Sequence, residues 1–419
     1  MKTTFKKIAA ALCAAVLAGS LCGCVDNGYI MTVDGMKIKN GVYLSFQQNS
    51  FESATQRLDE QRESGEDDDS NNSALDNDSA TYDIFSEVID GKPFGDWVKK
   101  DTMSAVLRFV GIQRQCEKFG ITLSDEELSK IYSQVQENWD YEDFYVKWIY
   151  GYDTMGAYYE SMGISVDSLK EIGVVNALNE KLFLHYYGEG GELAVPDNEI
   201  DAFINENYAG YRMITLSYKD INGNSLSGDA FNALFDDAEE YARRLNNGES
   251  FVNVYYDYDL KANKESARLQ AEETYMEMLE AGLVDDNGLT VDGLTEEQFI
   301  EKAVESATAT KRESDNAFDS VISLNTSGLE DGLKDYIFEH AADKKASVFE
   351  GEDAVYVVVK LPMSDVKGWR EANLTTLLFA LKGDAFNSMM DIICQNYEVK
   401  QNDYLIDKKY SPEKGYEFF

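Results

Sequence analysis

Histidine is almost absent from this sequence, which holds only His185 and His340 in 419 residues. Both stand near the C-terminal ends of predicted helices, where the helix dipole favours a partly charged imidazole. Neither has a second histidine or a cysteine at metal-ligand spacing, and the motifs HExxH, GxSxG and GxGxxG are missing. The sequence therefore predicts neither a metal site nor a cofactor.

Proline and cysteine are scarce as well. None of the four prolines lies between Pro93 and Pro196, which favours a helical domain in that stretch. Of the five cysteines, Cys13 and Cys22 lie in the N-terminal leader described next and Cys24 directly follows it, which leaves Cys116 and Cys394. A large exported chain with two cysteines is not a disulfide scaffold, so two buried free thiols or one bridge between them are the open alternatives.

Long apolar runs are missing after the N-terminus, so no segment reaches the roughly 20 apolar residues that span a membrane. Three lysines followed by IAAALCAAVLAG predict a signal peptide over residues 1–23. It ends in Leu-Cys-Gly-Cys, which resembles a bacterial lipobox, where cleavage precedes the last cysteine. Cys24 is therefore the predicted lipidation site. We expect the chain to be lipid-anchored at the bacterial cell membrane and to face outside the cytoplasm.

Basic residues are outnumbered two to one, with 38 lysines and arginines against 77 acidic residues and a net charge of −39. Loss of the three leader lysines would take this charge to −42. Such a surface repels polyanions at long range, which excludes nucleic acid as a partner. The 396 residues that remain after residue 23 are too many for one ordinary core, so we expect at least two domains.

The segment 59–83 reads DEQRESGEDDDSNNSALDNDSATYD and has almost no apolar residues. It cannot bury enough surface to order itself, so the sequence predicts an acidic disordered insertion. Asp67, Asp69, Asn71 and Asp78 fall at calcium-loop positions. The turn glycine and the flanking amphipathic helices of such a loop are missing, which disfavours calcium binding.

Hydrophobic periodicity predicts a mostly helical chain with a few strands. Residues 97–187 repeat apolar side chains at spacings of three and four, and Ser124 with Glu127 forms a capping box. Ser165 or Asp167 is the predicted cap of the next helix and Asp197 that of a third. YRMITLSYKD at 211–220 and DAVYVVVKLP at 353–362 have strand patterns, which makes the fold class α+β.

Four stretches, in this order, resemble the SurA/PrsA-type foldases, exported chaperones that often carry parvulin-type prolyl isomerase domains. They are TVDGMKI, the 98–135 segment with FGITLSDEEL, VPDNEIDAFINENYAGYRMITLS and AADKKASVFEGEDAVYVVVKL. The resemblance implies a mostly helical SurA/trigger-factor-like chaperone domain and a small parvulin-like α/β domain. The implied boundaries are 24–58 and 84–205 for the first domain, 206–363 for the second with a helical insertion at about 262–312, and 364–419 for a C-terminal helix and tail that pack on the chaperone domain.

The residues that would carry isomerase activity are missing from this pattern. Active parvulins have a histidine on the first strand and another on the last. The resemblance places Ile214 and Val357 in these two positions, and the glycine-rich stretch of the family is also missing. Isomerisation lowers a barrier of ~20 kcal/mol through a polar network around a desolvated peptide, which aliphatic side chains cannot supply. The sequence therefore predicts no catalytic residue; if the chain were an enzyme, the resemblance implies a prolyl isomerase.

The densest aromatic stretch, NWDYEDFYVKWIYGYDTMGAYYESMG, is the candidate surface for binding unfolded chains, because aromatic side chains contact many sequences without fixed geometry. Sugar stacking and ordinary helix packing are the alternatives. The predicted client-binding residues are Trp139, Tyr145, Trp148, Tyr152, Tyr158 and Tyr159.

Three functions follow from these patterns. The leading one is a membrane-anchored chaperone that assists unfolded or partly folded exported proteins without isomerase activity. A ligand- or solute-binding surface lipoprotein is the first alternative, although such receptors need two lobes with repeated strand–helix alternation. An active prolyl isomerase is the second and requires a catalytic scheme without either histidine.

Overall fold

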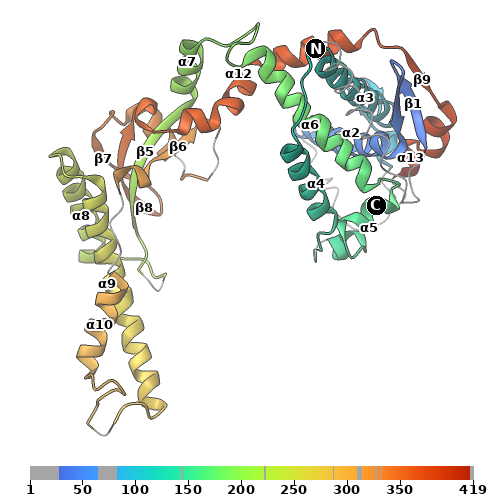
Figure 1. Ribbon diagram of the computed structural model, residues 1–419. Helices are drawn as coiled ribbons and strands as arrows, with labels where there is room; N and C mark the ends of the chain where they lie inside the picture. The colour runs from blue at the N-terminus through green and yellow to red at the C-terminus, as the bar shows by residue number, and fades with distance from the viewer. Residues whose placement is uncertain are drawn as a thin grey trace. The chain divides into compact units, whose positions relative to one another are not determined.

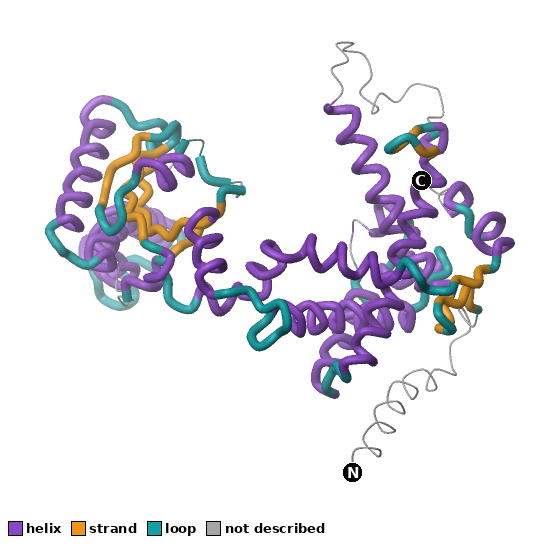
Figure 2. The backbone as a smooth tube through the Cα atoms, turned by 90° about the horizontal axis from the view of Figure 1, so that it is seen from above, coloured by secondary structure: helices purple, strands orange, loops and turns teal. Residues whose placement is uncertain are grey.

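A computed structural model describes residues 28–64, 83–142, 144, 146–220, 223–285, 287–308, 314–325, 328–330 and 332–415. The chain divides into two compact units (Figure 1). The first unit comprises Met1–Val195 and Lys382–Phe419, and the second comprises Pro196–Leu381. Helix makes up most of the described chain and the strands form small antiparallel sheets, which confirms the predicted α+β class (Figure 2).

The first unit contains a three-stranded sheet in the order β2-β1-β9. The β1 strand (Tyr29–Val33) turns at Asp34 and Gly35, both with positive φ, into β2 (Met36–Lys39). The third strand, β9 (Val399–Gln401), comes from the far end of the chain and pairs antiparallel with β1. Its three side chains are exposed, so it has no alternating burial pattern, and the sequence did not predict it.

Helices pack around this sheet, and their caps largely follow the sequence. Ser124 and Glu127 form the predicted capping box, and Ser165 rather than Asp167 caps the next helix. Phe94 packs edge-on against Phe51 and Phe85 in one part of the core. The elements of this unit are α2 (Asn40–Ser64), η1 (Ile84–Ser86), β3 (Val88–Ile89), β4 (Lys92–Pro93), α3 (Phe94–Phe119), α4 (Asp125–Trp139), η2 (Val146–Tyr150), α5 (Met155–Ser161), α6 (Val166–Tyr187), the later part of α12 (Trp369–Cys394), η6 (Leu405–Lys409) and α13 (Pro412–Gly415).

The second unit is built on a four-stranded antiparallel sheet in the order β6-β5-β8-β7. The two central strands, β5 (Tyr208–Ser217) and β8 (Ala354–Leu361), confirm the two strand predictions. Helices α8 and α9 cover one face, and the short α11 and η4 cover the other. The remaining elements are α7 (Asp197–Asn207), α8 (Gly228–Asn246), α9 (Phe251–Glu280), α10 (Glu296–Thr308), η3 (Asp315–Phe318), β6 (Ser320–Ser323), α11 (Leu333–Asp335), η4 (Tyr336–His340), β7 (Ala346–Glu350) and η5 (Met363–Asp365).

The predicted acidic insertion at 59–83 needs correction at both ends. Residues 59–64 continue α2, because Ala54 and Leu58 anchor the preceding turns in the core and Glu, Gln and Arg are good helix formers. Asp83 caps η1. A low content of apolar residues argues against burial but not against an exposed helical extension. The calcium-loop positions and the rest of the insertion lie outside the described residues, as do the predicted signal peptide and Cys24.

The division into units also differs from the predicted boundary at 205/206. Helix α7 belongs to the second unit, where Asp197 and Asp201 bind Arg370 at 2.6 and 3.1 Å. Asp197 is therefore an ion-pair partner and not the helix cap, a position held by Pro196. Residues 364–381 were expected to pack on the chaperone domain, but they belong to the second unit, where the Trp369 ring lies 5.0 Å from that of Tyr208.

The insertion predicted at 262–312 is a helical hairpin whose first helix begins earlier, at Phe251, because Phe251 and Val254 fill the core under the sheet. The two remaining cysteines, Cys116 and Cys394, are buried free thiols. Within the described ranges, no helix is both long enough and apolar enough to cross a membrane.

Candidate functional site: an exposed aromatic surface

The segment that joins α4 to α5 in the first unit exposes several large apolar side chains within ten residues. Phe144 is 75% exposed and Trp148 is 72% exposed, although aromatic side chains of this size are mostly buried in folded proteins. We define the aromatic surface by these two residues together with Tyr141, Ile149 and Tyr150. An exposed ion pair links η2 to the loop before α5, with the charged groups of Lys147 and Asp153 2.7 Å apart.

Stacked rings form the base of the aromatic surface. The Tyr150 and Tyr158 rings lie 4.4 Å apart and nearly parallel, and the Trp139 and Tyr159 rings stack at 6.2 Å. Gly156 is required here, because a Cβ on it would lie 2.4 Å from the indole nitrogen of Trp139. The α5 backbone at Gly156 therefore packs directly against the Trp139 indole at the end of α4.

Burial moves the pKa values of two tyrosines in the base further above physiological pH. It is the largest cause that raises the pKa of Tyr158 and that of Tyr159, and the nearby Glu52 carboxylate adds to both shifts. Gln48 donates a 3.5 Å hydrogen bond to the Tyr158 hydroxyl, which satisfies this buried polar atom. The base therefore offers neutral rings at physiological pH and no group that could act as an acid or a base.

The structure separates the six predicted client-binding residues by their exposure. Trp148 points to solvent, Trp139, Tyr152 and Tyr159 are half-buried, and Tyr158 is buried. Tyr158 thus belongs to the supporting core and not to a contact surface. Tyr145 lies outside the described residues. The predicted list omitted four exposed residues of this surface, because the sequence pattern does not show which side chains tertiary partners leave uncovered: Tyr141, Phe144, Ile149 and Tyr150.

The two positions that the resemblance assigned to the missing histidines meet in the second unit. Ile214 on β5 and Val357 on β8 are direct cross-strand partners although 143 positions separate them. Both have no exposed surface and pack under α8 and α9, against Ala238, Tyr241 and Val254. A peptide cannot reach either side chain without displacing these helices.

The other face of the same strands is also covered. Tyr356 on β8 is 9% exposed and packs with Val358 and Ile337. Its hydroxyl donates a 2.6 Å hydrogen bond to Glu330, and burial followed by this bond raises the pKa of Tyr356. Glu330 also accepts the backbone N–H of Glu352. Glu330 thus satisfies both the Tyr356 hydroxyl and the Glu352 backbone at this end of the sheet.

The two histidines lie away from both sheet positions. His185 is in the last turn of α6 and its ring contacts Phe119 at 4.6 Å. His340 ends η4 and lies 6.2 Å from the Tyr336 ring, with its side chain largely exposed. Both therefore stand near helix C-termini, as the sequence indicated. Across the residues that can be placed, three or more His, Cys, Asp or Glu side chains do not gather into a metal-binding group.

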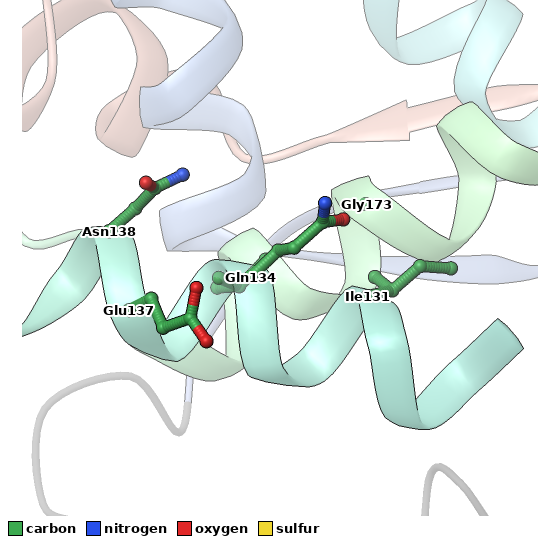
Figure 3. A pocket seen from close by; sticks show the side chains of 6 residues that line it. Ile131, Gln134, Glu137, Asn138 and Gly173 are labelled. Carbon is green, nitrogen blue, oxygen red and sulfur yellow. The ribbon is translucent and has the colours of Figure 1, made fainter. Parts of the chain in front are cut away.

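A shallow hollow lies between α4 and α6 in the first unit (Figure 3). It encloses about 520 Å³ and is lined by Ile131, Gln134, Val135, Glu137, Asn138 and Gly173. The two helices approach closely at Gly173, where a Cβ would lie 2.9 Å from a methyl group of Ile131. The labelled polar side chains do not converge on one point, so the hollow does not present a built ligand site.

No protein-family model and no curated protein sequence matches the chain. Among solved structures, the chain is similar to the crystal structure of foldase protein PrsA from Streptococcus pneumoniae, with 15% identity and a TM-score of 0.28. The match covers 80% of this chain and 98% of that chain. A TM-score of this size does not establish a shared fold.

Proposed function

We propose that this protein is a membrane-anchored extracytoplasmic chaperone that holds unfolded or partly folded exported proteins and has no prolyl isomerase activity. The observation that carries the proposal is the aromatic surface, where Phe144, Trp148 and Ile149 are exposed on a base of stacked rings. Contiguous exposed apolar side chains of this kind mark interaction surfaces. Rigid aromatic side chains contact varied partners at a small cost in conformational entropy.

The chemistry of this surface favours a polypeptide over a small solute. Its side chains are exposed on and just before the π-helical turn η2, whereas small ligands are held in concave pockets that bury most of their area. The base supplies neutral rings, so binding depends on apolar contact. Unfolded chains present apolar side chains in many sequences, and a surface without fixed polar partners can bind them all weakly.

The proposed lack of isomerase activity is supported by Ile214 and Val357. The resemblance placed two histidines at these positions, and their direct pairing across β5 and β8 supports that assignment. Here both side chains are aliphatic and fully buried. The polar network that the reaction needs has no counterpart at these positions, and the second unit would act as a packing domain of parvulin-like topology.

The proposed location is supported by the leader. The lipobox-like sequence before Cys24 would attach the chain to the membrane through lipid, with unfolded exported proteins as partners. A lipid-anchored chaperone would meet its clients as they leave the export machinery. The strong negative charge would keep it soluble and monodisperse at a crowded surface.

The test uses the chain from residue 24 onward with Cys24→Ser, which removes the lipid. We expect this protein to slow aggregation of a chemically unfolded client at a near-stoichiometric ratio. We also expect no isomerisation of a proline tetrapeptide above the uncatalysed rate. Clear turnover would overturn the proposed lack of isomerase activity, and unchanged aggregation would overturn the chaperone proposal in favour of a solute-binding lipoprotein.

A matched pair of variants assigns the activity to the aromatic surface. The triple variant Phe144→Ser, Trp148→Ser, Ile149→Ser should lose most of the aggregation suppression, because it removes the exposed apolar area. The control variant Leu193→Ser, Ile392→Ser, Tyr404→Ser changes three other exposed apolar residues of the same unit and should keep the activity. Equal loss in both variants would contradict a specific role of the aromatic surface.

A further inference from the structure

The insertion in the second unit forms a helical hairpin that extends beyond the sheet (Figure 1). We define the hairpin as residues 262–308, which include the later part of α9 and all of α10. Its interior is small: Ala271 and Tyr275 are buried, and the Tyr275 ring lies 6.1 Å from that of Phe299. The Tyr275 hydroxyl donates a 2.9 Å bond to the Gly288 carbonyl, which fixes the turn between the helices.

The outer face of the hairpin carries an apolar stripe. Leu269, Met276 and Leu279 are spaced by seven and three residues, which places them on one side of α9. Met276 is 52% exposed, and Leu269 and Leu279 are nearly as open. Ala271 and Tyr275, which are buried against α10, point away from Leu269 and Met276, and Leu279, four residues after Tyr275, lies at the border between this buried side and the stripe. Leu283 and Val291, which is 75% exposed, add apolar surface at the turn.

Carboxylates flank this stripe. Glu265 and Glu273 stand four residues before and after Leu269, and Glu280 stands four residues after Met276, so all three share its face. All three are exposed. Over residues 262–308 the sequence has 12 acidic and 3 basic side chains, a net charge of −9. The stripe therefore combines apolar contact area with a dense negative field.

We propose that the outer face of the hairpin binds a cationic amphipathic segment of another polypeptide. Its apolar side would cover Leu269, Met276 and Leu279, and its lysines or arginines would meet the flanking carboxylates. Charge selects this occupant. A second copy of the hairpin, with a charge of −9, and an anionic lipid surface would both be repelled. A neutral segment would gain nothing from the flanking field.

This surface belongs to the second unit and stands on its own residues, so it does not depend on the aromatic surface of the first unit. It would give the protein a second binding surface, which selects polypeptide segments by their positive charge. The first surface would accept apolar segments of any charge, and the hairpin would favour basic ones.

The binding test uses the Cys24→Ser chain and a fluorescent peptide of about five helical turns made of leucine and lysine in amphipathic order. We expect saturable binding in fluorescence anisotropy that weakens as NaCl rises from about 0.05 M to about 0.5 M. Two control peptides, one with glutamate in place of lysine and one with the same composition in scrambled order, should bind at least about tenfold more weakly. Equal binding of the scrambled peptide would overturn the proposal.

Two triple variants locate the binding. The first variant removes the apolar stripe and should weaken peptide binding about tenfold or more: Leu269→Gln, Met276→Gln, Leu279→Gln. The second removes the flanking charges and should weaken peptide binding and reduce its salt dependence: Glu265→Gln, Glu273→Gln, Glu280→Gln. The second triple replaces only exposed carboxylates, so it decides the question even if the first unfolds the hairpin. The triple serine variant of the aromatic surface, with Phe144, Trp148 and Ile149 replaced, should bind the peptide with unchanged affinity. Binding that survives both hairpin triples, or that is lost in the aromatic triple alone, would overturn the proposal without affecting the chaperone test.

Discussion

At the scale of single residues, Ile214 and Val357 show how a change of side chain alters what a sheet can do. The two are opposite each other on the central strands and fill the space under α8 and α9. A histidine in either place would need a hydrogen-bond partner, because an unpaired buried polar group destabilises the fold. The described neighbours in this cluster are almost all apolar, so the pair stabilises the unit and supplies no chemistry.

This role predicts a large loss of stability on truncation. Ile214→Ala should lower the free energy of unfolding by about 3 kcal/mol, because it leaves a cavity at a fully buried position. Thr215→Ala, at the exposed neighbour on the same strand, should cost less than about 1 kcal/mol. Urea denaturation followed by circular dichroism measures both. Similar losses in the two variants would contradict the assigned core position of Ile214.

At the scale of elements, α4 shows how a helix end is held by charge. Ser124 accepts the Glu127 N–H, and Glu127 accepts the Ser124 N–H at 2.7 Å. Lys181 on α6 donates a further bond of 2.8 Å to the same carboxylate. The Lys181 bond, followed by the two bonds from Ser124, lowers the pKa of Glu127 from 4.5 to about 2. The capping box therefore joins α4 to α6 as well as starting the helix.

The lowered pKa predicts a pH-dependent effect of Glu127→Gln. A carboxyl whose pKa is depressed by folding contributes stability above its unfolded pKa of 4.5, and this contribution is lost as pH falls through about 2. The variant should therefore have a lower Tm than the parent at neutral pH, and the difference should shrink between pH 4.5 and about 2. Glu126→Gln, in the same turn, is the control. A Tm difference that stays constant across this pH range would rule out the carboxylate as its source.

Two elements, the end of α2 and the strand β9, are not predicted by the local sequence pattern. α2 extends past the exposed residues 59–62 to Ser64, because the turns before them are anchored by Ala54 and Leu58. β9 forms because β1 offers it an edge, although its own three residues carry no strand pattern. In both cases the element forms because a neighbouring part of the structure, the anchored turns of α2 or the strand β1, is held in place by the core.

At the scale of the whole molecule, charge dominates. The net charge of −39 means that the compact state brings many carboxylates together, and self-repulsion lowers its stability relative to the unfolded chain. The ion pairs among described residues use most of the arginines but leave an excess of acidic groups. The hairpin, with 12 acidic and 3 basic residues, is one example of this excess.

This imbalance predicts that moderate salt stabilises the protein. Raising NaCl from about 0.05 M to about 0.5 M should raise the Tm by a few degrees. The added salt shortens the Debye length and so weakens the repulsion between carboxylates in the folded state. KCl at the same ionic strength should give the same increase, since the effect depends on ionic strength and not on ion identity. Differential scanning calorimetry measures both series. An unchanged or falling Tm would show that favourable ion pairs outweigh the repulsion.

Several features of this protein were determined by its sequence alone, because they depend on residues close together along the chain. The capping box at Ser124, the hairpin turn at Asp34 and the strands around Ile214 and Val357 all follow from local spacing. The tertiary structure alone decided which side chains are covered. Tyr158 and Trp148 look alike in the sequence, but Tyr158 on α5 stacks on Tyr150 and is buried, whereas Trp148 is exposed. The stripe of α9 is exposed because α10 packs against a different side of that helix. Burial depends on partners distant in sequence, and local patterns do not contain that information.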